Sequence, residues 1–177
     1  MQSLESGMWL QAGFSANNMD KILTLSETTA RLLEVVNELK LIPVGRPIHK
    51  YNELLFVARL PEHISITINV PKDTDVYISR MALKHLIDRR KSKAEHIVRT
   101  IPCAIMKPLK IVDNSRKRKD SFLFFYTDRL VVCVVLEKTK TTRDCQVVSA
   151  FPVHPKIYKK MIDISGRAEF PPFELPS

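Results

Sequence analysis

The chain has 177 residues, of which 45% are hydrophobic, with eleven prolines and only four glycines. This length suits one domain with an N-terminal appendage. No GxGxxG or GxxxxGK sequence occurs, which excludes the common glycine-rich phosphate loops, and the longest apolar run, 130–136, is too short to cross a membrane. The formal net charge is +9, from 28 Lys and Arg against 19 Asp and Glu.

The excess charge is confined to residues 80–120. This segment holds thirteen basic residues and four acids, a net of +9 (13 − 4), so the remaining 136 residues carry fifteen of each sign (28 − 13 and 19 − 4). A neutral protein with one basic segment presents a positive surface to a partner, and RNA or another nucleic acid is the expected one. The candidate nucleic-acid-binding residues are Arg80, Lys84, Lys91, Lys93, Arg99, Arg116, Lys117, Arg118 and Lys119.

The start of the chain lacks the basic end and continuous apolar stretch of a signal peptide, so we expect a cytoplasmic protein with no membrane partner. The three cysteines are odd in number and unclustered, and Cys133 and Cys145 lie in apolar runs typical of buried strands. Neither a metal site nor a cofactor is expected.

We expect the first 75 residues to form an appendage that precedes the main domain. Residues 1–18 have no clear period and are expected to be disordered, and residues 19–75 form an extension. Thr24 to Glu27 is a capping box that opens a helix. Residues 54–60 and 64–70 are two extended runs separated by Pro61, which predicts a hairpin. The second run alternates isoleucine or valine with polar residues, as a strand with one solvent-exposed face does.

The remaining elements lie in residues 76–165, which are expected to form the main domain. Ser79 caps a helix whose apolar stripe includes Leu83 and Leu86, and a second capping box, Ser92 to Glu95, opens a helix that ends at Pro102. Strands are then expected at 109–112, 122–126, 130–137 and 145–151, followed by a short helix at 154–162 and a tail from 166.

Hairpin turns at 127–128 and 138–142 make this sheet antiparallel, and the wholly apolar run 130–136 predicts a central strand buried on both faces. The expected class is α+β: N-terminal helices and a small hairpin, followed by an antiparallel four-stranded sheet meander.

His85 is the first candidate for chemistry because it falls opposite the apolar stripe of its helix. Asp88 and Arg89 follow at i+3 and i+4, so both are its neighbours on the helix surface. Metal-independent RNA cleavage needs a base for the ribose 2′-hydroxyl, an acid for the leaving oxygen, and cations for the phosphate. The alternative is a solvated helix face that happens to contain a histidine.

The other candidates carry weaker signals. His96 and His154 are secondary histidines. The run Arg116 to Lys119 is a phosphate contact, a nuclear-localisation-like run or a solvated hairpin tip. Tyr126 places a hydroxyl near a turn. Ser149 is expected to share a strand face with Cys145, Val147 and Phe151, either as a site residue or as hydrogen-bonded core.

From residue 76 to 158, the order of these features resembles the phage-associated nucleases of the barnase–EndoU–colicin–RelE-like superfamily. The resemblance rests on a strand ending in Ser79, the helix with His85, a basic helix closed by Ile101-Pro102, and two late strands bearing Phe124-Phe-Tyr126 and Val147-Val-Ser-Ala-Phe-Pro152. It covers about half of the chain and rests on pattern order. It implies helices followed by a four-stranded antiparallel sheet, and RNA cleavage without metal. The implied catalytic residues are His85, Arg89, Arg90, Ser149 and Tyr126.

Two functions are therefore expected from the sequence. The first is a metal-independent ribonuclease with a phage- or toxin-like role, for which an inhibitor or antitoxin protein is a possible partner. The second is a non-catalytic nucleic-acid-binding protein that uses the basic surface of residues 80–120. The first needs His85, an arginine and Ser149 or Tyr126 to converge in one cleft, whereas the second needs only the positive face.

Overall fold

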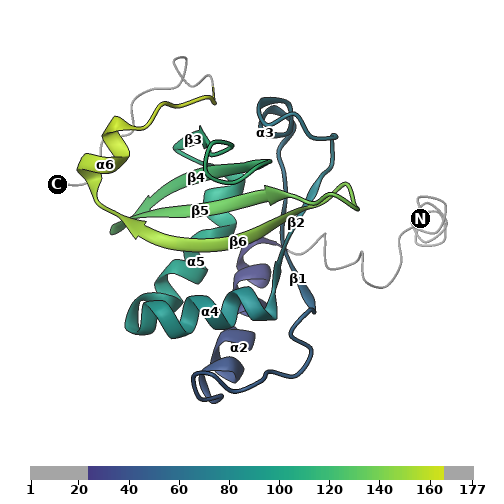
Figure 1. Ribbon diagram of the computed structural model, residues 1–177, viewed down its shortest axis with the longest axis vertical. Helices are drawn as coiled ribbons and strands as arrows, with labels where there is room; N and C mark the ends of the chain where they lie inside the picture. The colour runs from purple at the N-terminus through teal and green to yellow at the C-terminus, as the bar shows by residue number, and fades with distance from the viewer. Residues whose placement is uncertain (1–23, 166–177) are drawn as a thin grey trace.

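The computed structural model describes residues 24–165 as one mixed sheet with helices packed against it (Figure 1). The predictions for residues 1–18 and 166–177 lie outside the described residues. In chain order the elements are α2 (Leu25–Lys40), β1 (Leu54–Arg59), α3 (Glu62–Thr67), β2 (Asp75–Ser79), α4 (Arg80–Arg90), the 3-10 turn η2 (Lys91–Lys93), α5 (Ala94–Met106), β3 (Lys110–Asp113), β4 (Ser121–Asp128), β5 (Leu130–Lys138), β6 (Cys145–Val153) and α6 (Pro155–Lys160).

The sheet has six strands in the order β1-β2-β6-β5-β4-β3. The pair β2–β6 is parallel and every other neighbouring pair is antiparallel. The α+β class is confirmed, but the predicted four-stranded antiparallel sheet is wrong in extent and in type. Strands β3 to β6 are antiparallel neighbours, and β2 then continues the sheet in parallel while β1 adds an edge strand. Pairing partners far apart in the chain decided this, and no local pattern reports them.

The predicted hairpin of residues 54–70 is wrong because its second half is the helix α3. Ile64 and Ile68 are buried, whereas Ile66 between them is 73% exposed. Apolar residues four positions apart lie on one face of a helix and also on one face of a strand. A strand would bury Ile66 together with Ile64 and Ile68, whereas a helix buries only Ile64 and Ile68. The true partner of β1 is β2, with Phe56 opposite Tyr77.

The helix α5 continues past Pro102, contrary to the prediction that it ends there. Ala104 and Ile105, which follow the proline, are fully buried against the core, so their packing outweighs the lost backbone hydrogen bond. The second capping box is also wrong. The N-cap residue is Lys93, which makes no side-chain cap, and Glu95 pairs instead with Lys40 of α2. The capping box at Thr24 and the Ser79 cap on Ala82 are both confirmed.

A β-bulge in β6 changes which side chains share a face. Its pairing with β5 shifts register between Val135 and Leu136, so Val148 is an extra residue on the β6 side. Val147 and Ala150 consequently both pack in the core under the helices, while Phe151 packs on the opposite face. The expectation that Cys145, Val147, Ser149 and Phe151 share a face is therefore wrong, and Ser149 points to the same side as Phe151.

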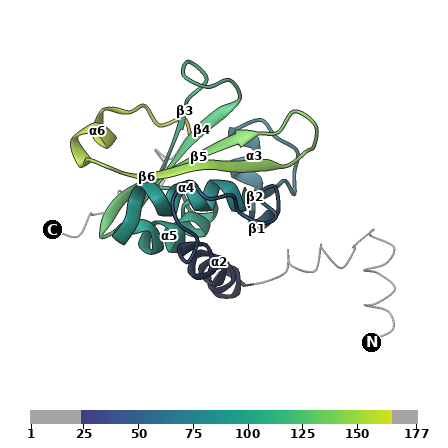
Figure 2. The same cartoon turned by 60° about the horizontal axis from the view of Figure 1, so that its bottom comes forward.

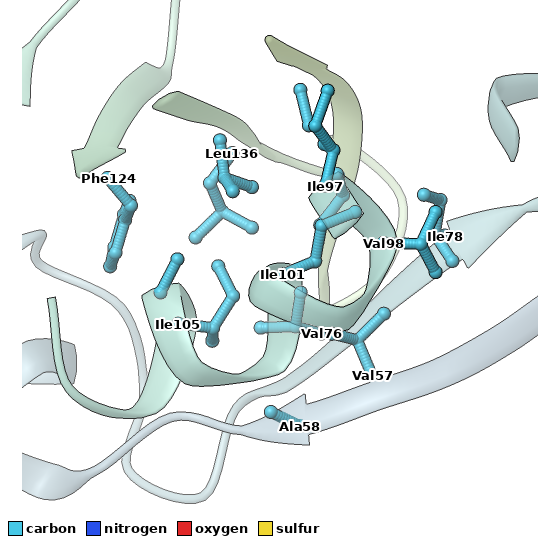
Figure 3. Packing of buried hydrophobic residues seen from close by; sticks show 14 of the residues in the cluster. Val57, Ala58, Val76, Ile78, Ile97, Val98, Ile101, Ile105, Phe124 and Leu136 are labelled. Carbon is cyan, nitrogen blue, oxygen red and sulfur yellow. The ribbon is translucent and has the colours of Figure 1, made fainter. Parts of the chain in front are cut away.

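The main core lies between the sheet and helices α2, α4 and α5, which share one side of the sheet (Figure 2). Figure 3 shows Ile97 and Ile101 of α5 packed among strand residues that include Val57, Val76 and Leu136. Residues from both sides of position 75 thus contribute to one core. The central-strand prediction is confirmed, since residues 131–136 are all buried and β5 lies between β4 and β6.

The opposite face of the sheet, here called the outer face, carries a smaller cluster of Phe125, Val131 and Cys133. Helix α6 covers this part, and the ring of Tyr158 lies 5.4 Å from that of Phe125. No helix within residues 24–165 is long and apolar enough to cross a membrane.

Candidate nucleic-acid interface

The turn between α4 and α5 concentrates positive charge. Helix α4 ends at Arg90, and Lys91 reverses the chain with a φ of 47°, so that a single 3-10 turn leads into α5. Four cations fall within these few residues, and all but Arg90 are exposed: Arg89, Arg90, Lys91 and Lys93. We call these four residues the basic turn.

The carboxylates nearest in sequence to the basic turn are already paired with other lysines. Lys84 Nζ lies 2.6 Å from Asp88 Oδ1, and Lys40 Nζ lies 2.7 Å from Glu95 Oε1. The hydrogen bond from Lys40 also lowers the pKa of Glu95, which keeps that carboxylate ionised. The positive charge of the basic turn is therefore not cancelled by its own sequence neighbours.

His85 lies on the exposed side of α4, one helical turn before Arg89. The opposite side of the same helix buries Leu83, Leu86 and Ile87, so core packing fixes the direction in which His85 points. A histidine can act as a general acid or base, and cations beside it can hold a phosphate within its reach. That chemistry also needs a second group in reach of the same phosphate.

Arg90 connects the basic turn to the last strand. Its guanidinium lies 5.7 Å from the ring centroid of Phe151, a cation–π contact. Ser149, two residues earlier in β6, is exposed on the same outer face as Phe151. Arg90 is thus next to β6, at the end of the sheet where that strand finishes.

Tyr126 lies on the other face of the sheet. It packs with the main core beside α5 and shares a side-chain hydrogen bond with Cys103. Burial raises the pKa of Tyr126 and also that of Cys103, so both groups stay protonated near neutral pH. The structure does not bring Tyr126 together with Ser149.

Two of the candidate nucleic-acid-binding residues are buried and held within the protein. Arg80 is bonded to Glu38 at 2.6 Å, and Lys84 donates both to Asp88 and to the Ile42 carbonyl. Only 8% and 9% of these two side chains are exposed, which leaves little surface for a phosphate.

The loop that carries Arg116, Lys117, Arg118 and Lys119 lies at the opposite end of the sheet from the basic turn. It precedes β4, and Arg118 pairs with Glu137 at the far end of β5, 2.6 Å away. A nine-residue strand spans about 30 Å, so the two basic groups of the sequence are separate surfaces.

The tertiary structure also adds cations that the charge count missed. Arg129 lies in the turn after Asp128, whose carbonyl contacts His96 at the start of α5, and three lysines of α6 follow β6 at the same end of the sheet. All four are exposed: Arg129, Lys156, Lys159 and Lys160. The net charge outside residues 80–120 is zero, so the sequence gives no sign of a basic surface there. The fold brings these four cations together at one end of the sheet. Together with the basic turn and Arg99, they form what we call the basic end of the sheet.

No family model, curated protein or solved structure matches this chain. Among residues 24–165, no three His, Cys, Asp or Glu side chains are grouped as a metal ion would require.

Proposed function

We propose that this protein binds RNA through the basic end of the sheet. The observation that carries the proposal is the pairing of Asp88 and Glu95 with Lys84 and Lys40, so that the carboxylates nearest in sequence do not cancel the charge of the basic turn. Each phosphate that such a cation neutralises releases condensed counterions, and this release drives binding. With four contacts from the basic turn, the log–log salt slope on single-stranded RNA is about −3.

The test is fluorescence anisotropy with a labelled RNA over a range of salt concentrations. The variant Arg89→Ala/Lys91→Ala should bind more weakly than the parent and reduce the slope by roughly 1.4, because two phosphate contacts are lost. The matched control is Arg46→Ala/Lys72→Ala, which removes the same charge from exposed positions outside the basic end and should change binding little. A salt-independent affinity, or an equal loss in both variants, would contradict the proposal.

Ribonuclease activity is the second candidate, and the exposed position of His85 one turn before Arg89 favours it. In this proposal His85 removes the proton of the ribose 2′-hydroxyl, whose oxygen bonds to phosphorus as the bond from phosphorus to the 5′-oxygen breaks, and the departing 5′-oxygen takes a proton from water. Arg89 and Arg90 bind the phosphate, and Ser149 donates a hydrogen bond to it from β6. Tyr126 has no role in this reaction because its side chain packs against α5 on the other face of the sheet. The toxin-like or phage role and the inhibitor partner that the resemblance implies belong to this candidate.

The decisive measurement is cleavage of a mixed RNA pool with EDTA present. His85→Ala should reduce the rate by about 10²–10⁴ while leaving RNA binding and thermal stability near those of the parent. If the parent shows no cleavage with EDTA or with added Mg²⁺, the ribonuclease candidate fails and RNA binding stands alone.

A further inference from the structure

Residues 24–165 cover the outer face of the sheet unevenly. Helix α6 packs over the part near β3 to β5, where Lys110 Nζ bonds the carbonyl oxygens of Tyr158 and Met161 and holds the C-terminal segment in place. Over β1, β2 and β6, the outer face carries partly exposed side chains. This second part reaches the basic end through β6, which pairs with β2 near its start and ends at the basic end.

Two aromatic rings stand on this open part. Phe56 of β1 and Tyr77 of β2 are directly opposite in register, with ring centroids 6.0 Å apart and planes at 73°. Val76 and Ile78 beside Tyr77, and Val57 beside Phe56, belong to the main core, so the two rings point away from the helices. Both rings are partly exposed. The position is unusual for aromatic residues, which most often complete a core.

Two carboxylates near these rings are paired with arginines. The buried Asp75 pairs with Arg59 at 3.0 Å, and Glu137 pairs with Arg118 at 2.6 Å, so these two groups repel an anionic ligand less than unpaired carboxylates would. Gln146 of β6 lies beside Tyr77 and offers an amide.

The same strand leads from these rings to the basic end. From Gln146 to Phe151, where Arg90 sits on the ring, β6 covers about 17 Å. A polyanion bound at the basic turn can therefore continue along β6 to the aromatic pair.

We propose that Phe56 and Tyr77 form a base-stacking subsite for single-stranded RNA that is anchored at the basic end. The inference deepens the proposed function and rests on it. A duplex keeps its base faces stacked inside the helix, whereas a single strand can lay them on aromatic rings. The subsite therefore gives a preference for single strands over duplexes, which the cations alone do not supply. It also assigns a role to the edge strand β1, which adds the second ring.

The experiment measures the affinity of the full chain for a mixed-sequence single strand of roughly ten nucleotides, within the usual range of such sites. Tyr77→Leu and Phe56→Leu should each weaken binding between about 5-fold and 150-fold, the range typical of losing one stacked base. Their salt slopes should match the parent, because no phosphate contact is removed. Tyr77→Phe keeps the ring and should bind like the parent.

Tyr51→Leu is the matched control, since Tyr51 is 52% exposed in the loop before β1 and lies outside the aromatic pair. It should leave affinity unchanged. A second arm compares the single strand with a duplex of equal length, and the leucine variants should lose the preference for the single strand. Thermal melting of every variant checks that it is folded. If a leucine variant melts early, Tyr77→Phe still tests whether the aromatic ring, without its hydroxyl, is enough for binding.

The two proposals fail in different ways. If Arg89→Ala/Lys91→Ala weakens binding but the leucine variants do not, the stacking subsite is overturned and RNA binding at the basic end stands. If the parent does not bind RNA, both fail. If the leucine variants change only the oligomeric state, measured by light scattering, the rings form a contact between copies of the chain and the stacking proposal is overturned.

Discussion

At the scale of single residues, the same residue type has opposite roles depending on its partners. Lys84 is buried between Asp88 and the Ile42 carbonyl, whereas Lys91, seven residues later, is exposed on the basic turn. The basic segment thus divides into cations that hold the fold and cations available to a partner. Charge count alone does not separate them.

This division predicts two different phenotypes. Lys84→Met should lower the free energy of unfolding by about 1–3 kcal/mol, because the partly buried Asp88 and the Ile42 carbonyl lose their donor. Lys91→Met should leave stability within about 0.5 kcal/mol, as surface changes usually do, and should weaken RNA binding. Urea denaturation measures the first effect and anisotropy the second. Equal stability of the two variants would show that the Lys84 contacts contribute nothing.

The cysteines make a second prediction at this scale. Burial raises the pKa of Cys133 and of Cys145 to about 12, so both thiols stay protonated in the folded protein at about pH 8. Cys103 is partly exposed, and its pKa is raised in the same direction by burial. An alkylating reagent should therefore modify Cys103 first, and mass spectrometry should find the other two modified only after urea is added. Early modification of Cys133 would contradict its burial in β5.

At the scale of elements, the isoleucines of α3 form a pattern that fits either a strand or a helix, and the tertiary structure decides between the two. Ile64, Ile66 and Ile68 fit an alternating strand, yet the helix buries the first and last and exposes the middle one. The choice depends on the main core, which both buried isoleucines join. Helix α5 makes a similar point, since burial of residues beyond Pro102 extends it past a residue that usually ends a helix.

The helical assignment predicts unequal effects of one substitution at two neighbouring positions. Ile64→Asp should unfold the protein or destabilise it by several kcal/mol, because it buries an unpaired charge. Ile66→Asp should be tolerated, because that side chain is 73% exposed. Circular dichroism during thermal melting distinguishes the two. If Ile66→Asp is the more damaging variant, α3 does not adopt this orientation.

At the scale of the whole molecule, the residues before position 76 belong to the same core as those after it. Leu32, Val36 and Leu39 of α2 and Val57 of β1 are all buried in the main core with the helices α4 and α5. The extension therefore supplies part of the interior, and its edge strand supplies one ring of the proposed stacking subsite.

A fragment of residues 76–165 should accordingly fail to fold on its own. Without α2 and β1, the apolar faces of α4, α5 and β2 are exposed to water, and a chain of that size has little stability to lose. The fragment should show no cooperative thermal transition, whereas the full chain should show one. A sharp transition in the fragment would instead establish residues 76–165 as an independent domain.

Local chemistry determined what the sequence alone could predict. Short sequence patterns predicted four features: the capping box at Thr24, the cap at Ser79, the exposed side of α4 that carries His85, and the central strand of residues 131–136. Each pattern spans only a few neighbouring residues. Such signals are reliable because the interacting groups are close in sequence. The α+β class follows from them as well.

The tertiary structure decided everything that depends on distant partners. The parallel pairing of β2 with β6 and the bulge that turns Ser149 to the outer face arise from strand register, which local pattern does not contain. The availability of a cation was decided in the same way, because Arg80 is held by Glu38, 42 residues away. Contacts of this kind form only when the chain is folded, so they determined which positive charges could reach a phosphate.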